Sequence, residues 1–336
     1  MVFITGSTGL LGSKLLFDLL SEGYRVRAMA RGGVPSWKVL SHYFNADTFG
    51  SDQLEWVSGD IGDRSALLEL LQGVSTVYHC AGKVSFDPKD RHLLQEVNVT
   101  GTANIVDACL INGVSALCHV SSVAALGRSQ NGVYDENTVW NPSEQHSHYA
   151  ISKYAAEREI WRGMAEGLNV VMVNPGIILG PGNWESDSSA LFSRVYNGLR
   201  FHTKGANGFI SVDDVSRAMM TLVEKKIFGD RFVLVGANLP YRKVIEQIAD
   251  ALGAPRPTIH AGPFLSNLAW RWEAISCRLT GRRPLITRET ARSAQTVSHY
   301  ASRKIQEILP GICKNPVTAL KTTGSRFLQQ WNQSDS

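Results

Sequence analysis

Apolar and polar positions follow two different periods along the first half of the chain. Short apolar runs are typical of buried strands, and apolar residues three and four apart are typical of helices. The runs predict strands at residues 3–5, 25–30, 54–57, 76–80, 116–121 and 170–173. Helices are predicted between them, at about residues 13–22, 65–71, 92–112 and 149–166. Strands separated by helices of this length indicate a parallel sheet covered on both faces.

Three glycines follow the first predicted strand and precede the first predicted helix. They are Gly6, Gly9 and Gly12. A loop of this kind lets the backbone approach a pyrophosphate, which the N-terminal amides of the helix would then face. A glycine triplet alone is equally compatible with an ordinary strand-turn-helix. Because alternating strands and helices follow in order, we interpret it as the start of a dinucleotide-binding half.

The pattern loosens after residue 175. A helix at residues 212–224 and a strand at 231–235 return to the sheet, and the chain from residue 240 onward is mostly helical. We therefore predict an α/β protein with a doubly wound parallel sheet of the Rossmann type and a smaller, mainly helical C-terminal substrate lobe. The Rossmann domain takes residues 1–176 with the returning segment 209–236, and the substrate lobe takes 177–208 and 237–336.

Composition narrows the class of protein. With 336 residues, 43% hydrophobic and 19% charged, the chain suits one large domain and a smaller lobe. Because a strand begins at the first residues, we expect no leader peptide and a cytoplasmic protein. Five scattered cysteines indicate reduced thiols, and we expect neither a disulfide framework nor a metal site. The chain from residue 256 onward carries +8 and the remainder −4, yet no nucleic-acid motif accompanies the basic lobe, so we expect no nucleic-acid partner.

A tyrosine and a lysine four residues apart form the second candidate for chemistry. On a helix, Tyr149 and Lys153 share a face. The ammonium should stabilise a phenolate and lower the tyrosine pKa from about 10 toward neutrality, which makes the tyrosine a usable proton donor or acceptor. The spacing recurs at Tyr300 and Lys304, which we interpret as a plain surface helix. Only Tyr149 follows a strand that ends in a serine, Ser122, able to bind a substrate carbonyl.

Together these motifs resemble the extended short-chain dehydrogenase/reductase family, also called the NAD-dependent epimerase/dehydratase family. The resemblance covers nearly the whole chain. It includes segments 59–61, 79–82, 98–102, 174–176, 180–182 and 209–214.

The resemblance implies a role for each matching residue. The implied catalytic residues are Ser122, Tyr149, Lys153 and Asn98. The implied cofactor contacts are Gly6, Ser7, Thr8, Gly9, Leu10, Leu11, Gly12, Arg31, Asp60, Ile61, Cys80, Ala81, Gly82, Tyr149, Lys153, Pro175, Gly176 and Ile178. The implied substrate contacts are Phe86, Ser122, Val123, Tyr149 and Ile177.

The end of the second strand bears on the cofactor. Enzymes that use NAD place an acidic residue there to bind the ribose hydroxyls. This chain has Ala30 followed by Arg31, whose guanidinium suits a 2′-phosphate. We expect NADP in preference to NAD, although Arg31 could also stack on the adenine.

Two departures from sugar-nucleotide enzymes bear on the substrate. Dehydratases of the family carry Asp-Glu after the catalytic hydroxyl, where this chain has Val123 and Ala124. Epimerases carry an asparagine where this chain has Ile177. Both changes favour a pocket for hydrocarbon. The C-terminal lobe, with an apolar stripe over residues 264–279, resembles that of the dihydroflavonol-reductase and 3β-hydroxysteroid-dehydrogenase-like branch. We therefore expect reduction of a small apolar carbonyl substrate. A nucleotide-sugar epimerase and a non-catalytic regulator that senses dinucleotide are the alternatives.

An apolar stripe in the C-terminal lobe leaves three interpretations open. The stripe consists of Phe264, Leu265, Leu268, Trp272, Ile275 and Leu279, with Arg271 and Arg278 beside it. It could be a lid over the substrate, a weak contact with a membrane surface, or the inner face of a packed helix. The direction of hydride transfer and the oligomeric state stay open, and a homodimer is one option.

Overall fold

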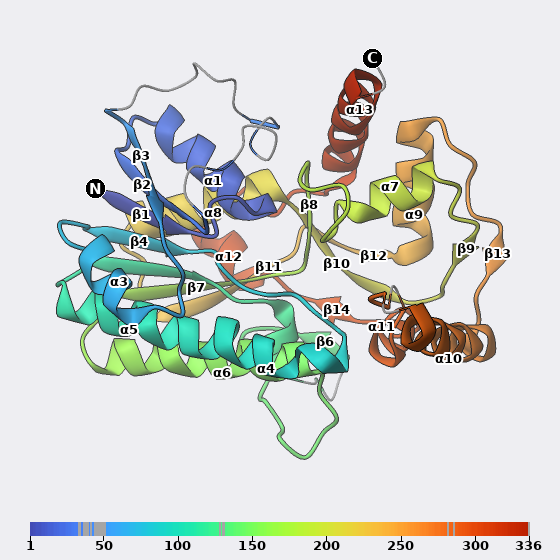
Figure 1. Ribbon diagram of the computed structural model, residues 1–336, viewed down its shortest axis with the longest axis horizontal. Coiled ribbons are helices and arrows are strands. Elements are labelled where there is room, and N and C mark those ends of the chain that lie inside the picture. Colours follow the sequence, from blue (N-terminus) through green and yellow to red (C-terminus); the bar gives the residue numbers. More distant parts are fainter. Residues whose placement is uncertain are drawn as a thin grey trace.

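A seven-stranded sheet forms the centre of the larger lobe (Figure 1). The computed structural model describes residues 1–32, 35, 40, 42–43, 52–127, 129, 132–280, 282–284 and 286–334. The strands are β1 (Val2–Thr5), β2 (Val26–Ala30), β3 (Leu54–Ser58), β4 (Thr76–His79), β5 (Ala116–Val120), β7 (Val170–Pro175) and β11 (Asp230–Leu234). Their order is β11-β7-β5-β4-β1-β2-β3, and every pair is parallel. The predicted doubly wound sheet is confirmed, and its strand order reverses between β1 and β4.

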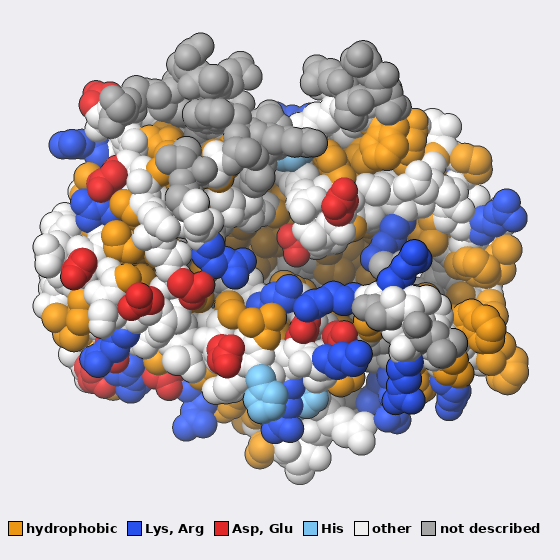
Figure 2. Space-filling view, viewed as in Figure 1, with side chains coloured by type: hydrophobic (Ala, Val, Ile, Leu, Met, Phe, Trp, Pro, Cys, Tyr) orange, Lys and Arg blue, Asp and Glu red, His pale blue; other side chains and the backbone are white. Residues whose placement is uncertain are grey.

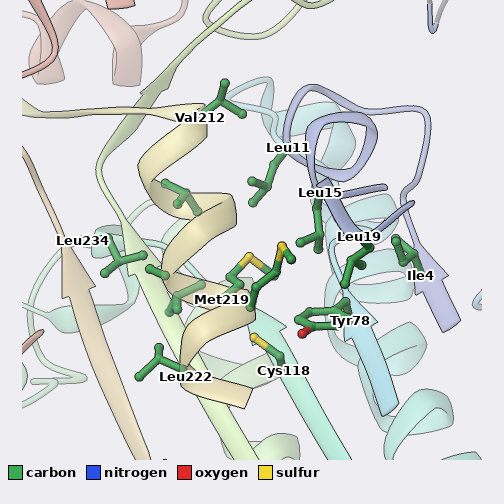
Figure 3. Packing of buried hydrophobic residues seen from close by; sticks show 14 of the residues in the cluster. Ile4, Leu11, Leu15, Leu19, Tyr78, Cys118, Val212, Met219, Leu222 and Leu234 are labelled. Carbon is green, nitrogen blue, oxygen red and sulfur yellow. The ribbon is translucent and has the colours of Figure 1, made fainter. Parts of the chain in front are cut away.

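Helices cover both faces of this sheet (Figure 1). One face carries α1 (Leu10–Ser21), α8 (Val212–Glu224) and α12 (Arg303–Ile308), and the other carries α3 (Arg64–Leu70), α5 (Gly101–Ile111) and α6 (His148–Ala165). Figure 3 shows how leucines of α1 meet α8 above the strands. The residues in this contact include Leu11, Leu15, Leu19, Met219, Leu222, Tyr78 and Cys118. Because both faces of the sheet are covered, apolar residues make up most of the inner strands, as in the segment VVMV of β7.

The smaller lobe is built from helices around short sheets. Its helices are α7 (Ala190–Tyr196), α9 (Tyr241–Leu252), α10 (Pro263–Thr280), α11 (Arg288–Ser293) and α13 (Val317–Ser334). Its strands β8 (Ile177–Leu179), β10 (Ala206–Ser211) and β12 (Ala237–Pro240) form one sheet, and β9 (Phe201–His202) pairs with β13 (Ile259–His260). The lobe has its own core, which includes Phe192, Phe209, Ile248 and Phe327. The exact division of the chain between the two lobes stays a prediction. That prediction assigns residues 237–336 to the smaller lobe, whereas Ile305 of α12 packs into the core of the larger lobe.

Two local predictions are corrected by the structure. The helix expected at residues 92–112 is α4 (Arg91–Leu94), a π-helical segment η2 (Gln95–Thr100) and then α5. Tyr300 does not lie on a surface helix with Lys304. It belongs to β14 (His299–Tyr300), which pairs with β6 (Val133–Tyr134), and its ring lies 5.2 Å from the ring of Tyr134. Strand pairing and aromatic contact outweigh the helical spacing there.

Most of the polar segment at residues 32–53, between β2 and β3, lies outside the described residues. Along the described ranges, none of the helices combines the length and hydropathy that a bilayer crossing requires.

Candidate functional site

The glycine loop after β1 is tightly folded and needs its glycines. Gly6 has φ +67°, and a Cβ at this position would lie 2.7 Å from the Ala81 nitrogen. A Cβ on Gly12 would lie 2.0 Å from the Gly6 oxygen. Gly9 begins α1 without any side-chain cap, and the first turn holds no acidic residue. The first amides of α1 are therefore left for an anion such as a pyrophosphate, so the loop fits the predicted cofactor.

The loop after β4 lies beside the glycine loop at the point where the strand order reverses. Backbone atoms of Cys80 and Ala81 pack against Gly6, and the Ala81 amide donates to the Thr5 hydroxyl at 3.1 Å. A Cβ on Gly82 would lie 3.1 Å from the Lys153 ammonium and 3.4 Å from the Asn98 amide oxygen. Open α/β sheets bind ligands at this switch point. The structure thus places the loop after β4 between Gly6 on one side and Lys153 and Asn98 on the other, although these residues are far apart in the sequence.

Three further predicted cofactor residues lie at the ends of β2 and β3, which are neighbouring strands. Arg31 follows β2, is exposed, and makes no hydrogen bond or ion pair with any described residue. Asp60 is exposed after β3, and its carboxylate accepts the Gly62 amide at 2.7 Å. Ile61 is buried, and a Cβ on Gly101 would lie 2.6 Å from its Cδ1. None of the described residues therefore competes with a ligand for the Arg31 guanidinium at this edge.

Tyr149 lies in the first turn of α6, buried against residues from two other segments. The side chain of Ser147 caps the helix by accepting the Ala150 amide at 2.8 Å. Tyr149 is 9% exposed and is hydrogen-bonded to the side chain of Ser122, which follows β5. Its ring lies 5.7 Å from the ring of Phe86. The structure therefore places Ser122 and Phe86 at Tyr149, and their catalytic and substrate-binding roles stay predictions.

Lys153 and Asn98 each donate a hydrogen bond to a backbone carbonyl, and both side chains lie near Gly82. The Lys153 ammonium donates to the Val120 oxygen at 2.9 Å. The Asn98 amide oxygen accepts the Lys83 amide at 2.7 Å, and its nitrogen donates to the Lys83 oxygen at 3.0 Å. Asn98 lies in the π-helical segment, a type of irregularity that is frequent at functional sites. The segment orients Asn98 toward the loop after β4.

The pKa values differ from the prediction made for the tyrosine. Burial raises the pKa of Tyr149, the hydrogen bond with Ser122 opposes this, and the charge of Asp187 adds to it. Burial lowers the pKa of Lys153 to about 8, against the charge of Glu157. The expected lowering of the Tyr149 pKa is therefore wrong for the folded protein. The loss of hydration on burial decides the direction of the Tyr149 pKa, and the Lys153 ammonium donates its hydrogen bond to the Val120 carbonyl.

A buried carboxylate beneath the site was missed by the sequence analysis. Glu157 is 1% exposed and accepts hydrogen bonds from the Ser121 hydroxyl at 2.6 Å and the Asn174 amide at 2.5 Å. Its other oxygen pairs with Arg231 at 2.9 Å. Glu157 follows Lys153 by four residues and Tyr149 by eight, so the helical period alone could have identified it. Asp187, from the loop before α7, was also missed and has no such signal.

The turn between the lobes holds three more of the predicted cofactor residues, Pro175, Gly176 and Ile178. Pro175 ends β7 opposite Leu234, and a Cβ on Gly176 would lie 2.4 Å from the Gly208 oxygen, which explains the glycine. The Ile178 carbonyl accepts the Ser188 hydroxyl.

The remaining predicted substrate residues differ in their surroundings. Val123 is buried at the start of η3 (Val123–Leu126), next to Ser122. Ile177 is half-buried and packs against the core of the smaller lobe, so its contact with substrate stays a prediction. Within the ranges that the structure covers, no three His, Cys, Asp or Glu side chains are grouped as a metal site.

Comparison with known proteins agrees with this geometry. The sequence is 30% identical to sterol demethylase protein B of Methylococcus capsulatus, over 78% of this chain and 77% of that protein. It is 29% identical to a putative dihydroflavonol 4-reductase of Synechocystis, over 91% and 88%. A solved structure, that of gox2253, has a TM-score of 0.79 at 25% identity and covers 98% of both chains. The profile of the NAD dependent epimerase/dehydratase family matches residues 2–236. The chain therefore belongs to the NAD dependent epimerase/dehydratase family and uses a nicotinamide dinucleotide.

Proposed function

We propose that the protein is an NADP(H)-dependent oxidoreductase that reduces a carbonyl group on an apolar, cyclic substrate. The observation that carries the proposal is the half-buried Ser122 hydroxyl at the buried Tyr149, beside Phe86. Two hydroxyls that share one hydrogen bond can bind one carbonyl oxygen, and the aromatic ring beside them offers an apolar contact.

Each residue has a chemical task in this reduction. The bound nicotinamide supplies the hydride. Ser122 donates a hydrogen bond to the carbonyl oxygen, and Tyr149 donates the proton to the alkoxide that forms. A raised pKa keeps Tyr149 protonated at neutral pH, which suits a proton donor. Lys153 binds the ribose and holds positive charge beside the developing alkoxide.

The surroundings of the hydroxyl pair favour hydrocarbon over sugar. Phe86 and Val123 are both apolar, and they lie beside Tyr149 and Ser122. Figure 2 shows a hollow between the two lobes with hydrophobic side chains in its depth. The two relatives named for a sterol and a dihydroflavonol both refer to fused or linked ring systems. These features support a substrate with fused or linked rings.

A spectrophotometric screen tests the substrate class. NADPH oxidation is followed with dihydroflavonols, ketosteroids, simple ketones and aldehydes, and epimerisation of UDP- and GDP-sugars is measured in parallel. Reduction of a ring ketone without sugar turnover is the expected result. Epimerisation of a sugar nucleotide would transfer the assignment to the epimerase alternative. Tight NADPH binding without any turnover would favour the dinucleotide-sensing regulator.

The preference for NADP over NAD rests on the end of β2. Ala30 is buried and carries no carboxylate for ribose hydroxyls, and the guanidinium of Arg31 is exposed and unpaired with the described residues. Arg31→Ala should weaken NADPH binding about tenfold, because a charge-assisted bond to a phosphate is lost, and should leave NADH binding unchanged. Combining it with Ala30→Asp should reverse the preference. Calorimetric titration measures both, and equal Kd values for the two cofactors in the unmodified protein would contradict the assignment.

A further inference from the structure

One face of α10 is apolar and exposed. Phe264 is 84% exposed, Trp272 is 73% exposed and Leu268 is 56% exposed. With Leu265 and Ile275 they span an arc of about 100° on the helix, at about 100° per residue. The stripe is therefore not the inner face of a packed helix. The side chain of Leu279, the last member predicted from the sequence, lies outside the described residues.

The opposite side of α10 faces the protein. Cys277 is buried and Ser266 is half-buried there. The Gln295 amide donates to the Ala261 oxygen at 2.7 Å and to the Ser266 hydroxyl at 2.8 Å, which fixes the start of the helix. An amphipathic helix that packs on the protein with one side and exposes large aromatic residues on the other is typical of helices that lie in a membrane interface.

Arginines border the apolar arc. Arg271 and Arg278 are exposed and lie next to it on one flank, within about 40° of Phe264. Residues 263–292 hold six arginines and two glutamates. Figure 2 shows hydrophobic side chains at the right-hand edge of the molecule, over α10, with Lys and Arg side chains beside them. The edge combines apolar area with positive charge.

The end of α10 is tied to the loop that carries Phe86. Arg283 pairs with the buried carboxylate of Asp90 at 3.0 Å, and the same carboxylate accepts the Ser85 hydroxyl at 2.7 Å. The next residue is Phe86, whose ring contacts Tyr149. The exposed face therefore lies on the side of the molecule where the loop next to the catalytic tyrosine is anchored.

We propose that α10 docks the protein on an anionic lipid bilayer, with its apolar arc in the interface and its arginines on the lipid phosphates. Charge complementarity selects this occupant. In a symmetric pair of chains the same face would meet itself and bring Arg271 and Arg278 of both copies together, which is unfavourable. Anionic phospholipid supplies both the hydrocarbon and the opposite charge. Uptake of an apolar substrate from the bilayer rests in addition on the proposed function, whereas docking does not.

Vesicle sedimentation tests the docking. The full chain is mixed with vesicles of phosphatidylcholine alone or with phosphatidylglycerol, at low and at high salt. We expect binding to the anionic vesicles that weakens with salt. Phe264→Ser with Trp272→Ser should lower the partition coefficient at least about tenfold, because the two largest apolar contacts are lost. Arg271→Glu with Arg278→Glu should lower it on anionic vesicles by at least about tenfold as well.

Matched controls separate docking from a general surface effect. Ile111→Ser with Val139→Ser removes apolar side chains that are 62% and 79% exposed elsewhere, and should leave binding unchanged. Arg25→Glu with Lys225→Glu makes the same change of charge away from α10. NADPH affinity, measured for every variant, reports whether the fold and the proposed function survive.

Three outcomes would overturn the proposal. The first is equal binding by the Phe264→Ser/Trp272→Ser variant and its control. The second is absence of binding by the unmodified chain. The third is a dimer in light scattering that the same variant dissociates, which would make the face an interface between two copies.

Discussion

Replacing Glu157 with glutamine should destabilise the protein and alter its pH profile. The substitution keeps the shape of the side chain and the oxygen that accepts from Ser121 and Asn174. It removes the negative charge and turns an amide toward Arg231, so two donors face each other at a pair now 2.9 Å apart. Arg231 is only 17% exposed and would keep its charge without its carboxylate.

The magnitude follows from burial. Breaking a buried ion pair by removing one partner costs about 3–5 kcal/mol, because the remaining charge is desolvated. The Arg231 guanidinium still donates to the Glu136 oxygen, which places the expected loss at about 3 kcal/mol. For a chain of this length, that loss corresponds to a fall in Tm of about 4 °C.

A second consequence reaches Lys153. The charge of Glu157 raises the pKa of Lys153 against the effect of burial. Without it, Lys153 should lose its proton at a lower pH. If reduction needs the charged lysine, the alkaline limb of kcat/KM moves to lower pH in the glutamine variant. This readout distinguishes a positioning residue from a merely structural one.

Glu159→Gln is the matched control on the same helix. Glu159 pairs with Arg162 at 2.9 Å, but both side chains are about one-third exposed. Such pairs contribute about 0–1 kcal/mol, so Tm should change by about 1 °C or less. Calorimetry and pH-dependent kinetics of both variants give the comparison. Equal losses of Tm for the two substitutions, or an unmoved alkaline limb in Glu157→Gln, would refute the reasoning.

Three more outcomes follow from the site. Tyr149→Phe should lower turnover by about two to four orders of magnitude, while Tyr300→Phe should stay within a few-fold; near-normal carbonyl reduction by the first variant contradicts the mechanism. Gly12→Ala puts a Cβ 2.0 Å from the Gly6 oxygen, so it should weaken NADPH binding at least about tenfold in calorimetric titration. The folded chain releases the Lys153 proton at about pH 8 and the unfolded chain near 10.5, so this group should make stability rise by about 3 kcal/mol across that window. Denaturant unfolding of Lys153→Met should lack the rise.

The sequence determined the order of strands and helices and the kind of loop that follows β1. These features are local, because strand and helix periods and the need for glycine depend on neighbours along the chain. Spacing also indicated that Tyr149 and Lys153 share a helical face, which holds in α6. The same spacing misled at Tyr300, since a strand partner distant in sequence decides its conformation.

Tertiary structure decided what surrounds the reacting groups. Desolvation sets the direction of the Tyr149 pKa, and it depends on packing of Phe86 and Ser122 from distant segments. The Lys153 ammonium donates a hydrogen bond to the carbonyl of Val120 in β5. The helical spacing of residues in α6 does not reveal that β5 lies beside this helix. The spacing of the apolar residues in α10 is the same whether the stripe is buried or exposed. Only the packed fold shows which side of the helix the protein covers, because burial is a property of surfaces brought together and not of the residues alone.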